Sequence, residues 1–279
     1  MAALDVLIPT CDRPDALAVT LAGLLGQTST DFRVVVSDQS EGQPAASSHA
    51  VLAASRALEQ RGRPVAWHRH LPRRGMAEHR AFLLSQAEAP LVLFLDDDVL
   101  LEPEVVERLV LTLADERCGF VGQGLIGLSY RDDVRPHQQD LELWEGPVEP
   151  ELVAPGTPQW ERYRLHNAAN LLHVQHRLGL SRADRVRYKV AWIGGCVLFD
   201  RAKLQAVGGF DFWPELPPEH CGEDVVAQVR VMARYGGCGV LPSGAYHQEL
   251  PTTIVERRFD APRLLPLGEH RPGPSGEDR

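Results

Sequence analysis

Short apolar runs alternate with stretches of helical spacing along the first third of the chain. The apolar runs, which we interpret as strands, cover residues 4–9, 33–37, 65–70 and 91–95, and the helical stretches cover 15–25, 45–61 and 76–87. This alternation predicts βαβ units with right-handed crossovers. We therefore expect an α/β fold with a mostly parallel, doubly wound central sheet flanked by helices.

The apolar run 91–95 leads directly into three acids, Asp96, Asp97 and Asp98. A run without polar alternation is typical of a strand buried on both faces, and the carboxyl end of such a strand is where open α/β sheets bind ligands. Two carboxylates about 5 Å apart repel by roughly 3 kcal/mol at an effective dielectric near 20. The cluster therefore favours a divalent cation with oxygen ligands, although acids in a solvated loop that caps the helix near Pro103 remain an alternative.

Composition and charge restrict the class of protein. The chain has 279 residues, of which 44% are hydrophobic and 24% charged, as in ordinary globular proteins. Its net charge of -9 argues against nucleic acid as a partner. No apolar run approaches the ~20 residues of a membrane span, and no signal peptide is evident, so we expect a cytoplasmic protein. Peripheral membrane contact and the oligomeric state stay open.

Two kinds of site are disfavoured by missing motifs. The five cysteines are scattered and show no CxxC spacing, so neither a disulfide framework nor a zinc site is expected. The chain also has no GxGxxG or Walker-type loop, which argues against an NAD enzyme or a P-loop hydrolase. A nucleotide bound here would need a metal ion to neutralise much of its diphosphate charge.

Further motifs lie on both sides of the three acids. Before them come VLIPTCDRP at 6–14, VVVSD at 34–38 and RRGMAEHR at 73–80; after them come GGCVLFDR at 194–201, GGFD at 208–211 and GEDV at 222–225. In this order they resemble the GT-A fold glycosyltransferases of family 2, over roughly residues 4–128 and 190–248. Arg73 and Ala81 stand where that family commonly has asparagines.

The resemblance implies a site for a nucleoside-diphosphate sugar donor. In it Asp38 binds the base, Asp96 the ribose, and Arg80 contacts the donor; alone, Asp38 would more often be a turn residue or a helix cap. The other donor-side candidates are Pro9, Thr10, Asp12, Arg13 and Asp97. Asp98 holds a divalent cation, Mn²⁺ or Mg²⁺, and His247 resembles the histidine that completes the metal shell in several GT-A enzymes. A surface or core role is the alternative for this histidine.

On the acceptor side the resemblance implies that Asp224, paired with Glu223, is the general base. It would take a proton from a hydroxyl of a carbohydrate or other acceptor as one sugar is transferred with inversion. The same acids would also suit the first turn of a helix, where the dipole favours them. Trp192, Gly194, Gly195 and Trp213 are the acceptor-side candidates. Aromatic faces suit sugar rings, but buried packing explains the tryptophans nearly as well.

We expect one GT-A domain over residues 1–265. It comprises a nucleotide-sugar half at 1–128, an insertion at 129–189 and an acceptor and catalytic half at 190–265, followed by a disordered tail at 266–279. Within the insertion we expect a long loop at 130–160, covering the acceptor pocket, and a helix at 159–178. The basic run 182–189 would meet phosphate or face solvent. The QxxRW motif of processive synthases is absent, which favours single-sugar transfer; the family also suggests cell-surface polysaccharide biosynthesis.

Two other functions remain. A sugar-phosphate nucleotidyltransferase shares this layout of sheet and acids, but such enzymes usually begin with a Gly-rich basic loop, and this chain has no glycine between Pro9 and Gly23. A non-catalytic nucleotide-sugar sensor would need no base, so the presence of both Asp98 and Asp224 argues against it.

Overall fold

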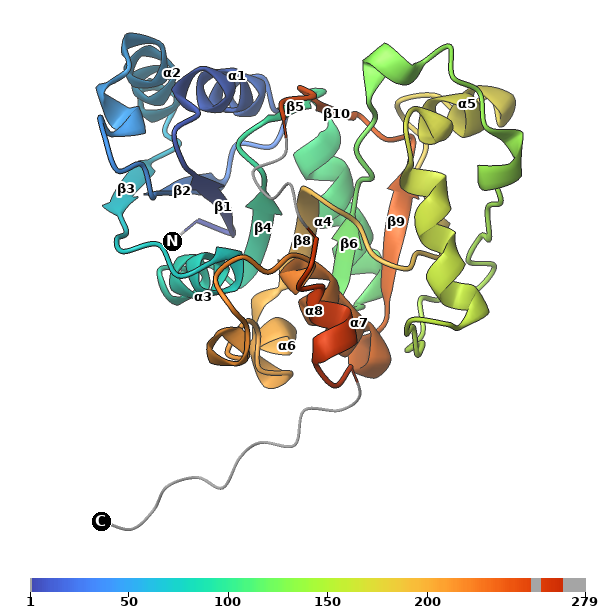
Figure 1. Ribbon diagram of the computed structural model, residues 1–279. Coiled ribbons are helices and arrows are strands. Elements are labelled where there is room, and N and C mark those ends of the chain that lie inside the picture. Colours follow the sequence, from blue (N-terminus) through green and yellow to red (C-terminus); the bar gives the residue numbers. More distant parts are fainter. Residues whose placement is uncertain (1, 252–256, 268–279) are drawn as a thin grey trace.

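A central mixed sheet covered by helices on both faces forms the body of the protein (Figure 1). The computed structural model describes residues 2–251 and 257–267. The eight strands lie in the order β3-β2-β1-β4-β8-β6-β9-β7. Their bounds are β1 Leu4–Thr10, β2 Phe32–Asp38, β3 Val65–Arg69, β4 Leu91–Leu95, β6 Phe120–Gly122, β7 Val186–Tyr188, β8 Cys196–Asp200 and β9 Gly237–Leu241. The neighbours from β3 to β4 are parallel, whereas β8 runs antiparallel to both β4 and β6.

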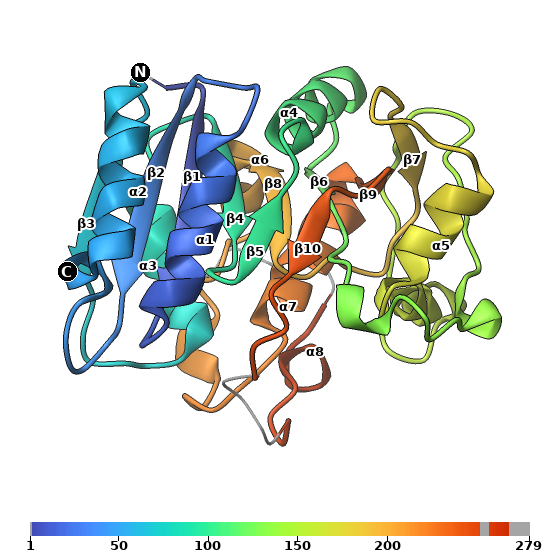
Figure 2. The same cartoon turned by 90° about the horizontal axis from the view of Figure 1, so that it is seen from above.

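The helices divide between the two faces of the sheet (Figure 2). One face carries α1 Pro14–Leu25, α2 His49–Gln60 and α4 Val105–Glu116, and the other carries α3 Met76–Ser85, α6 Arg201–Ala206, α7 Glu223–Tyr235 and α8 Ala261–Leu264. A second, two-stranded sheet pairs β5 Val99–Leu101 with β10 Ala245–His247. This pairing brings a late segment of the chain next to the three acids that follow β4.

The core consists of two clusters, one on each face of the sheet. On β4, Phe94 joins one cluster, whereas Leu93 and Leu95 join the other. Both faces of the strand are therefore covered, which explains its unbroken apolar sequence. The α/β class and the mostly parallel sheet that the sequence predicts are confirmed.

The secondary structure of the insertion differs from the prediction. The helix expected at 159–178 is two pieces, a 3₁₀ segment at Pro158–His166 and α5 at Asn170–Arg177. Between them Ala168 has a φ of 52°, a left-handed backbone conformation that interrupts helical hydrogen bonding. The loop preceding these pieces contains two short 3₁₀ turns, Leu128–Tyr130 and Pro136–Gln138.

The insertion supplies β7, the strand at the edge of the sheet next to β9, and its other segments lie on the same side of the molecule (Figure 2). The predicted tail falls largely on 268–279, outside the described residues, and the carbonyl of Pro266 accepts a hydrogen bond from Arg230. Within the described ranges no helix is long and apolar enough to cross a membrane.

Candidate active site

A cavity of about 680 Å³ opens where β1, β2 and β4 end. Its wall combines the β1–α1 turn, the start of α3, the acids after β4, the start of α7 and the segment after β10. Ten of the residues predicted from the sequence line it: Pro9, Thr10, Arg13, Arg80, Asp96, Asp97, Asp98, Glu223, Asp224 and His247. None of the described lining residues comes from 129–189, so the insertion does not cover this cavity.

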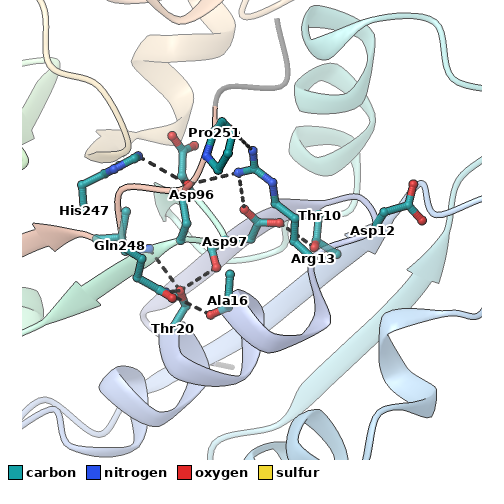
Figure 3. A network of polar contacts seen from close by, with 12 residues as sticks. Thr10, Asp12, Arg13, Ala16, Thr20, Asp96, Asp97, His247, Gln248 and Pro251 are labelled. Carbon is teal, nitrogen blue, oxygen red and sulfur yellow. Dashed lines mark hydrogen bonds and ion pairs between the residues drawn. The ribbon is translucent and has the colours of Figure 1, made fainter.

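Asp97 anchors the acidic run to β1 and α1. Thr10 Oγ1 donates a hydrogen bond of 2.6 Å to Asp97 Oδ2, and Thr20 Oγ1 donates one of 2.8 Å to the Asp97 carbonyl (Figure 3). Burial raises the pKa of the Asp97 carboxyl to about 7, with the Thr10 bond acting in the opposite direction. These bonds fix the backbone from which the flanking acids project.

Asp98 lies between Arg13 and His247. Its Oδ2 accepts a hydrogen bond of 3.0 Å from Arg13 Nη1 and lies 3.4 Å from His247 Nε2. Burial by itself favours the protonated carboxyl, but the hydrogen bond and charge of His247, together with the charge of Arg13, lower the pKa of Asp98. The same hydrogen bond to Asp98 raises the pKa of His247.

Asp98 and His247 would bind a divalent ion only together with further ligands from a bound nucleotide and water. A carboxylate oxygen and an imidazole nitrogen are suitable donors for Mn²⁺, and 3.4 Å is a separation that two ligands of one ion can have. Across residues 2–251 and 257–267, however, no three His, Cys, Asp or Glu side chains gather to hold an ion. Phosphate oxygens and water would have to complete its shell, as is usual for ions bound with nucleotides.

Arg80 connects the acids after β4 to those at the start of α7. Its Nε donates to Glu223 Oε1 at 2.9 Å, and its Nη2 donates to Asp96 Oδ1 at 3.1 Å. The guanidinium is buried and lies over the Phe94 ring, 5.6 Å from the centroid. The acids after β4 and those at the start of α7 thus share one ion-pair network.

Asp224 stands in the first turn of α7, partly exposed to the cavity. Desolvation and then the neighbouring charge of Glu223 raise the pKa of the Asp224 carboxyl to about 7, against the lowering effect of Arg80. A carboxyl that titrates near neutral pH can accept a proton in that range.

Asp38 and Asp12 lie outside the cavity lining. Asp38 is buried, and its two oxygens accept backbone hydrogen bonds from Ser40 at 2.8 Å and Ala45 at 2.6 Å. It therefore shapes the turn after β2, and Gln39 contributes to the wall instead. Asp12 has a φ of 55° and points away from the acidic cluster (Figure 3).

The four acceptor-side candidates are also not among the described residues that line the cavity. Gly195 has a φ of 74°, and its carbonyl accepts a hydrogen bond of 2.9 Å from the Asp96 amide, whereas Gly194 is exposed. Trp192 packs against Trp160 and Tyr163, with ring centroids 4.7 and 5.4 Å away. Trp192 and Trp213 are partly buried against the core, and neither lines the cavity.

Several wall residues were missed from the sequence. Gln39 directly follows the motif at 34–38, and Arg73 and His79 lie within the motif at 73–80, so their closeness to the strand ends was a usable signal. Leu250 and Arg257 carry no such signal. The pairing of β10 with β5 brings Leu250 to the site, whereas the bridge between Cys221 and Asp260 brings the segment of Arg257.

The comparisons agree with this architecture. The sequence model of glycosyl transferase family 2 matches residues 5–176, whereas no curated protein matches the chain. The structure of S. aureus TarS 1-349 is similar with a TM-score of 0.56 at 16% identity, covering 88% of this chain and 60% of that one. The structure of the same TarS segment with UDP-GlcNAc has a TM-score of 0.56 at 16% identity, covering 90% of this chain and 60% of that one.

The mannosyltransferase PcManGT from Pyrobaculum calidifontis, in complex with GDP-Man and Mn²⁺, is similar with a TM-score of 0.55 at 16% identity. The match covers 91% of this chain and 59% of that one. The chain thus spans about three fifths of the length of these structures, and at such identity the likeness shows the fold, which is GT-A. The family model extends over more than half of the chain, and the chain belongs to glycosyl transferase family 2.

Proposed function

We propose that the protein transfers one sugar from a nucleoside-diphosphate sugar to an acceptor hydroxyl with inversion, using Asp224 as general base. One observation carries the proposal: a single cavity at the carboxyl ends of the strands is lined by both Asp98 and Asp224, from distant parts of the chain. Membership of the family supports the class of reaction. The proposal treats residues 1–265 as one functional domain.

The donor class follows from the site and from the structural relatives. TarS 1-349 has been solved with UDP-GlcNAc and PcManGT with GDP-Man, so both similar structures hold nucleotide sugars. In this chain Pro9, Thr10 and Gln39 line the cavity at the ends of β1 and β2, where a base would lie. Asp38 would contribute indirectly, because its bonds to Ser40 and Ala45 fix the turn beside Gln39.

Asp98 and His247 would hold the divalent ion, Mn²⁺ or Mg²⁺. When bound there, the ion supplies positive charge that offsets the charge developing on the departing diphosphate. His247 must be neutral to bind a metal, so its hydrogen bond to Asp98 would be exchanged for coordination.

Asp224 would act on the acceptor. As the acceptor oxygen forms its bond to the anomeric carbon, the bond from that carbon to the diphosphate oxygen breaks, and the hydroxyl proton passes to the Asp224 carboxylate. A single displacement of this kind inverts the anomeric centre. Glu223, held by Arg80, would keep the first turn of α7 in register with the cavity.

A ligand screen tests the donor part of the proposal. Ligands that bind the native state stabilise it, by about 2.7 kcal/mol at one hundred times Kd. We expect one of UDP, GDP, ADP or dTDP, with Mn²⁺, to raise the Tm by several degrees, and the matching nucleotide sugar to release nucleoside diphosphate when acceptors are supplied. The absence of a shift with every diphosphate, with and without Mn²⁺, would contradict the proposal.

A further inference from the structure

The Arg80 guanidinium is enclosed by protein on the side facing the acids. The residue is only 6% exposed, although it lines the cavity. Its Nε and Nη2 are both committed to carboxylates, at 2.9 Å to Glu223 and 3.1 Å to Asp96. The residue sits within α3, so one cation joins α3, the end of β4 and the start of α7.

Three carboxylates depend on this one cation. Asp96, Glu223 and Asp224 raise the pKa of Arg80, against the opposing effect of burial, so the guanidinium stays charged. In return, Arg80 lowers the pKa of Asp224, which burial, Glu223 and Asp96 raise. Removing a partner from a buried ion pair is costly because the remaining charge is left uncompensated.

We infer that Arg80 is a positioning residue, which holds Glu223 and Asp96 in fixed geometry and thereby aims Asp224 at the acceptor, instead of binding the donor. The inference rests on the proposed role of Asp224 as base. It assigns Arg80 a different task from the donor contact that the family resemblance implies.

The backbone around Asp224 shows how the geometry would be transmitted. Gln228, one turn further along α7, accepts from the Ile193 amide and donates to the Ile193 carbonyl, both at 2.8 Å. Ile193 precedes the Gly194–Gly195 turn, whose carbonyl holds the Asp96 amide. The start of α7 is therefore tied to the end of β4 twice, by backbone through Ile193 and by charge through Arg80.

The test compares Arg80→Met and Arg80→Lys with the parent. For Arg80→Met we expect a nucleoside-diphosphate affinity within about threefold of the parent, kcat lower by about 10²-fold, and an acid limb of kcat/KM that moves to higher pH. Arg80→Lys keeps the charge but not the forked geometry, so it should restore the acid limb and only part of kcat. Cys221 and Arg257 also line the cavity near Asp224, and both are unchanged in these variants.

Arg230→Met is the matched control. Arg230 is a buried arginine on the same helix, but its guanidinium donates to the Pro266 carbonyl and lies over Phe212. We expect Arg230→Met to lower the Tm without moving the acid limb of the pH profile of kcat/KM. If Arg80→Met does not fold, Arg80→Lys and the double variant Arg80→Met with Glu223→Gln, which removes one repelling charge, provide the same comparison.

The outcomes distinguish failure of the Arg80 inference from failure of the proposed base role of Asp224. A loss of nucleoside-diphosphate affinity of more than about tenfold in Arg80→Met, with kcat retained, would overturn the inference and restore the donor contact. An acid limb of kcat/KM that stays at the same pH in Arg80→Met as in the parent would also overturn the inference. Asp224→Asn is measured in parallel: parental turnover in that variant would overturn the base assignment itself, whatever the Arg80 variants do.

Discussion

Arg13 Nη1 donates a hydrogen bond of 3.0 Å to Asp98 Oδ2, the carboxylate oxygen that also lies 3.4 Å from His247 Nε2. The other terminal nitrogen of Arg13 donates to the Pro251 carbonyl. The arginine therefore ties the β1–α1 turn to the segment after β10 across the mouth of the proposed metal site. An ion that binds Asp98 must compete with this guanidinium.

This competition predicts that Arg13→Met binds Mn²⁺ more tightly than the parent when no nucleotide is present. Partly exposed ion pairs contribute roughly 0.2–1 kcal/mol, so the gain should be up to about fivefold. Calorimetric titration with Mn²⁺ measures it. Arg73→Met is the control, because Arg73 lines the same cavity but, among the described residues, forms no ion pair with Asp98. Weaker Mn²⁺ binding in Arg13→Met would show that the arginine supports the ion.

Asp98→Asn should abolish the contribution of Mn²⁺ to nucleoside-diphosphate binding. The amide keeps the volume of the side chain but removes the anionic ligand, which water replaces poorly. We expect nucleotide affinity in Mn²⁺ to fall to the metal-free value. Titrations of parent and variant with and without Mn²⁺ measure this difference. An undiminished Mn²⁺ effect in the variant would exclude Asp98 as a ligand.

The two glycines after Ile193 form a matched pair of positions. A Cβ on Gly195 would lie 2.5 Å from Leu125 Cδ1 and 3.2 Å from Asp96 Oδ2, at a φ of 74°, whereas a Cβ on Gly194 would meet nothing within 4 Å. Gly195→Ala should therefore displace Asp96 and lower kcat/KM by about tenfold or more, a loss of ~1.4 kcal/mol. Gly194→Ala should stay close to the parent. Equal effects of the two variants on kcat/KM would contradict this reading.

The raised pKa of Asp224 predicts opposite pH trends for stability and activity. Its value in the folded protein, about 7, lies above the ordinary 3.8, so ionisation of this carboxyl opposes folding. The loss of stability begins above pH 3.8 and is complete above about pH 7, while the ionised base becomes available over the same range. Asp224→Asn should melt at a higher temperature than the parent at pH 8, with the difference shrinking towards pH 4. A difference in Tm that does not depend on pH would contradict the assignment.

The parallel half of the sheet could be predicted because short stretches rich in apolar and β-branched residues alternate with stretches of helical spacing. The strands expected at 4–9, 33–37, 65–70 and 91–95 are β1 to β4 with ends shifted by one residue or less. The reversed strand β8 and the interruption at Ala168 could not be predicted in this way. The direction of β8 depends on tertiary contacts with β4. The interruption depends on a left-handed backbone conformation that alanine rarely adopts.

The site could be predicted in its residue types but not in its partners. The acids after β4 and at the start of α7 reach one cavity, as the motifs suggested. Both carboxylate oxygens of Asp38, however, accept hydrogen bonds from backbone amides. Arg80 forms ion pairs with Asp96 and with Glu223. Sequence shows which groups are present near a strand end, whereas their hydrogen-bond partners depend on loops that meet only in the folded chain.

The most direct measurement compares turnover and donor affinity in Asp224→Asn. A general base contributes about 10²- to 10⁴-fold and need not touch the donor, and asparagine retains the size of the side chain. We expect release of nucleoside diphosphate in the presence of acceptors to fall by that factor, while the affinity for the nucleotide sugar stays within about twofold of the parent. Parental turnover in Asp224→Asn, or a loss of donor affinity that accounts for the whole decrease in rate, would contradict the central claim.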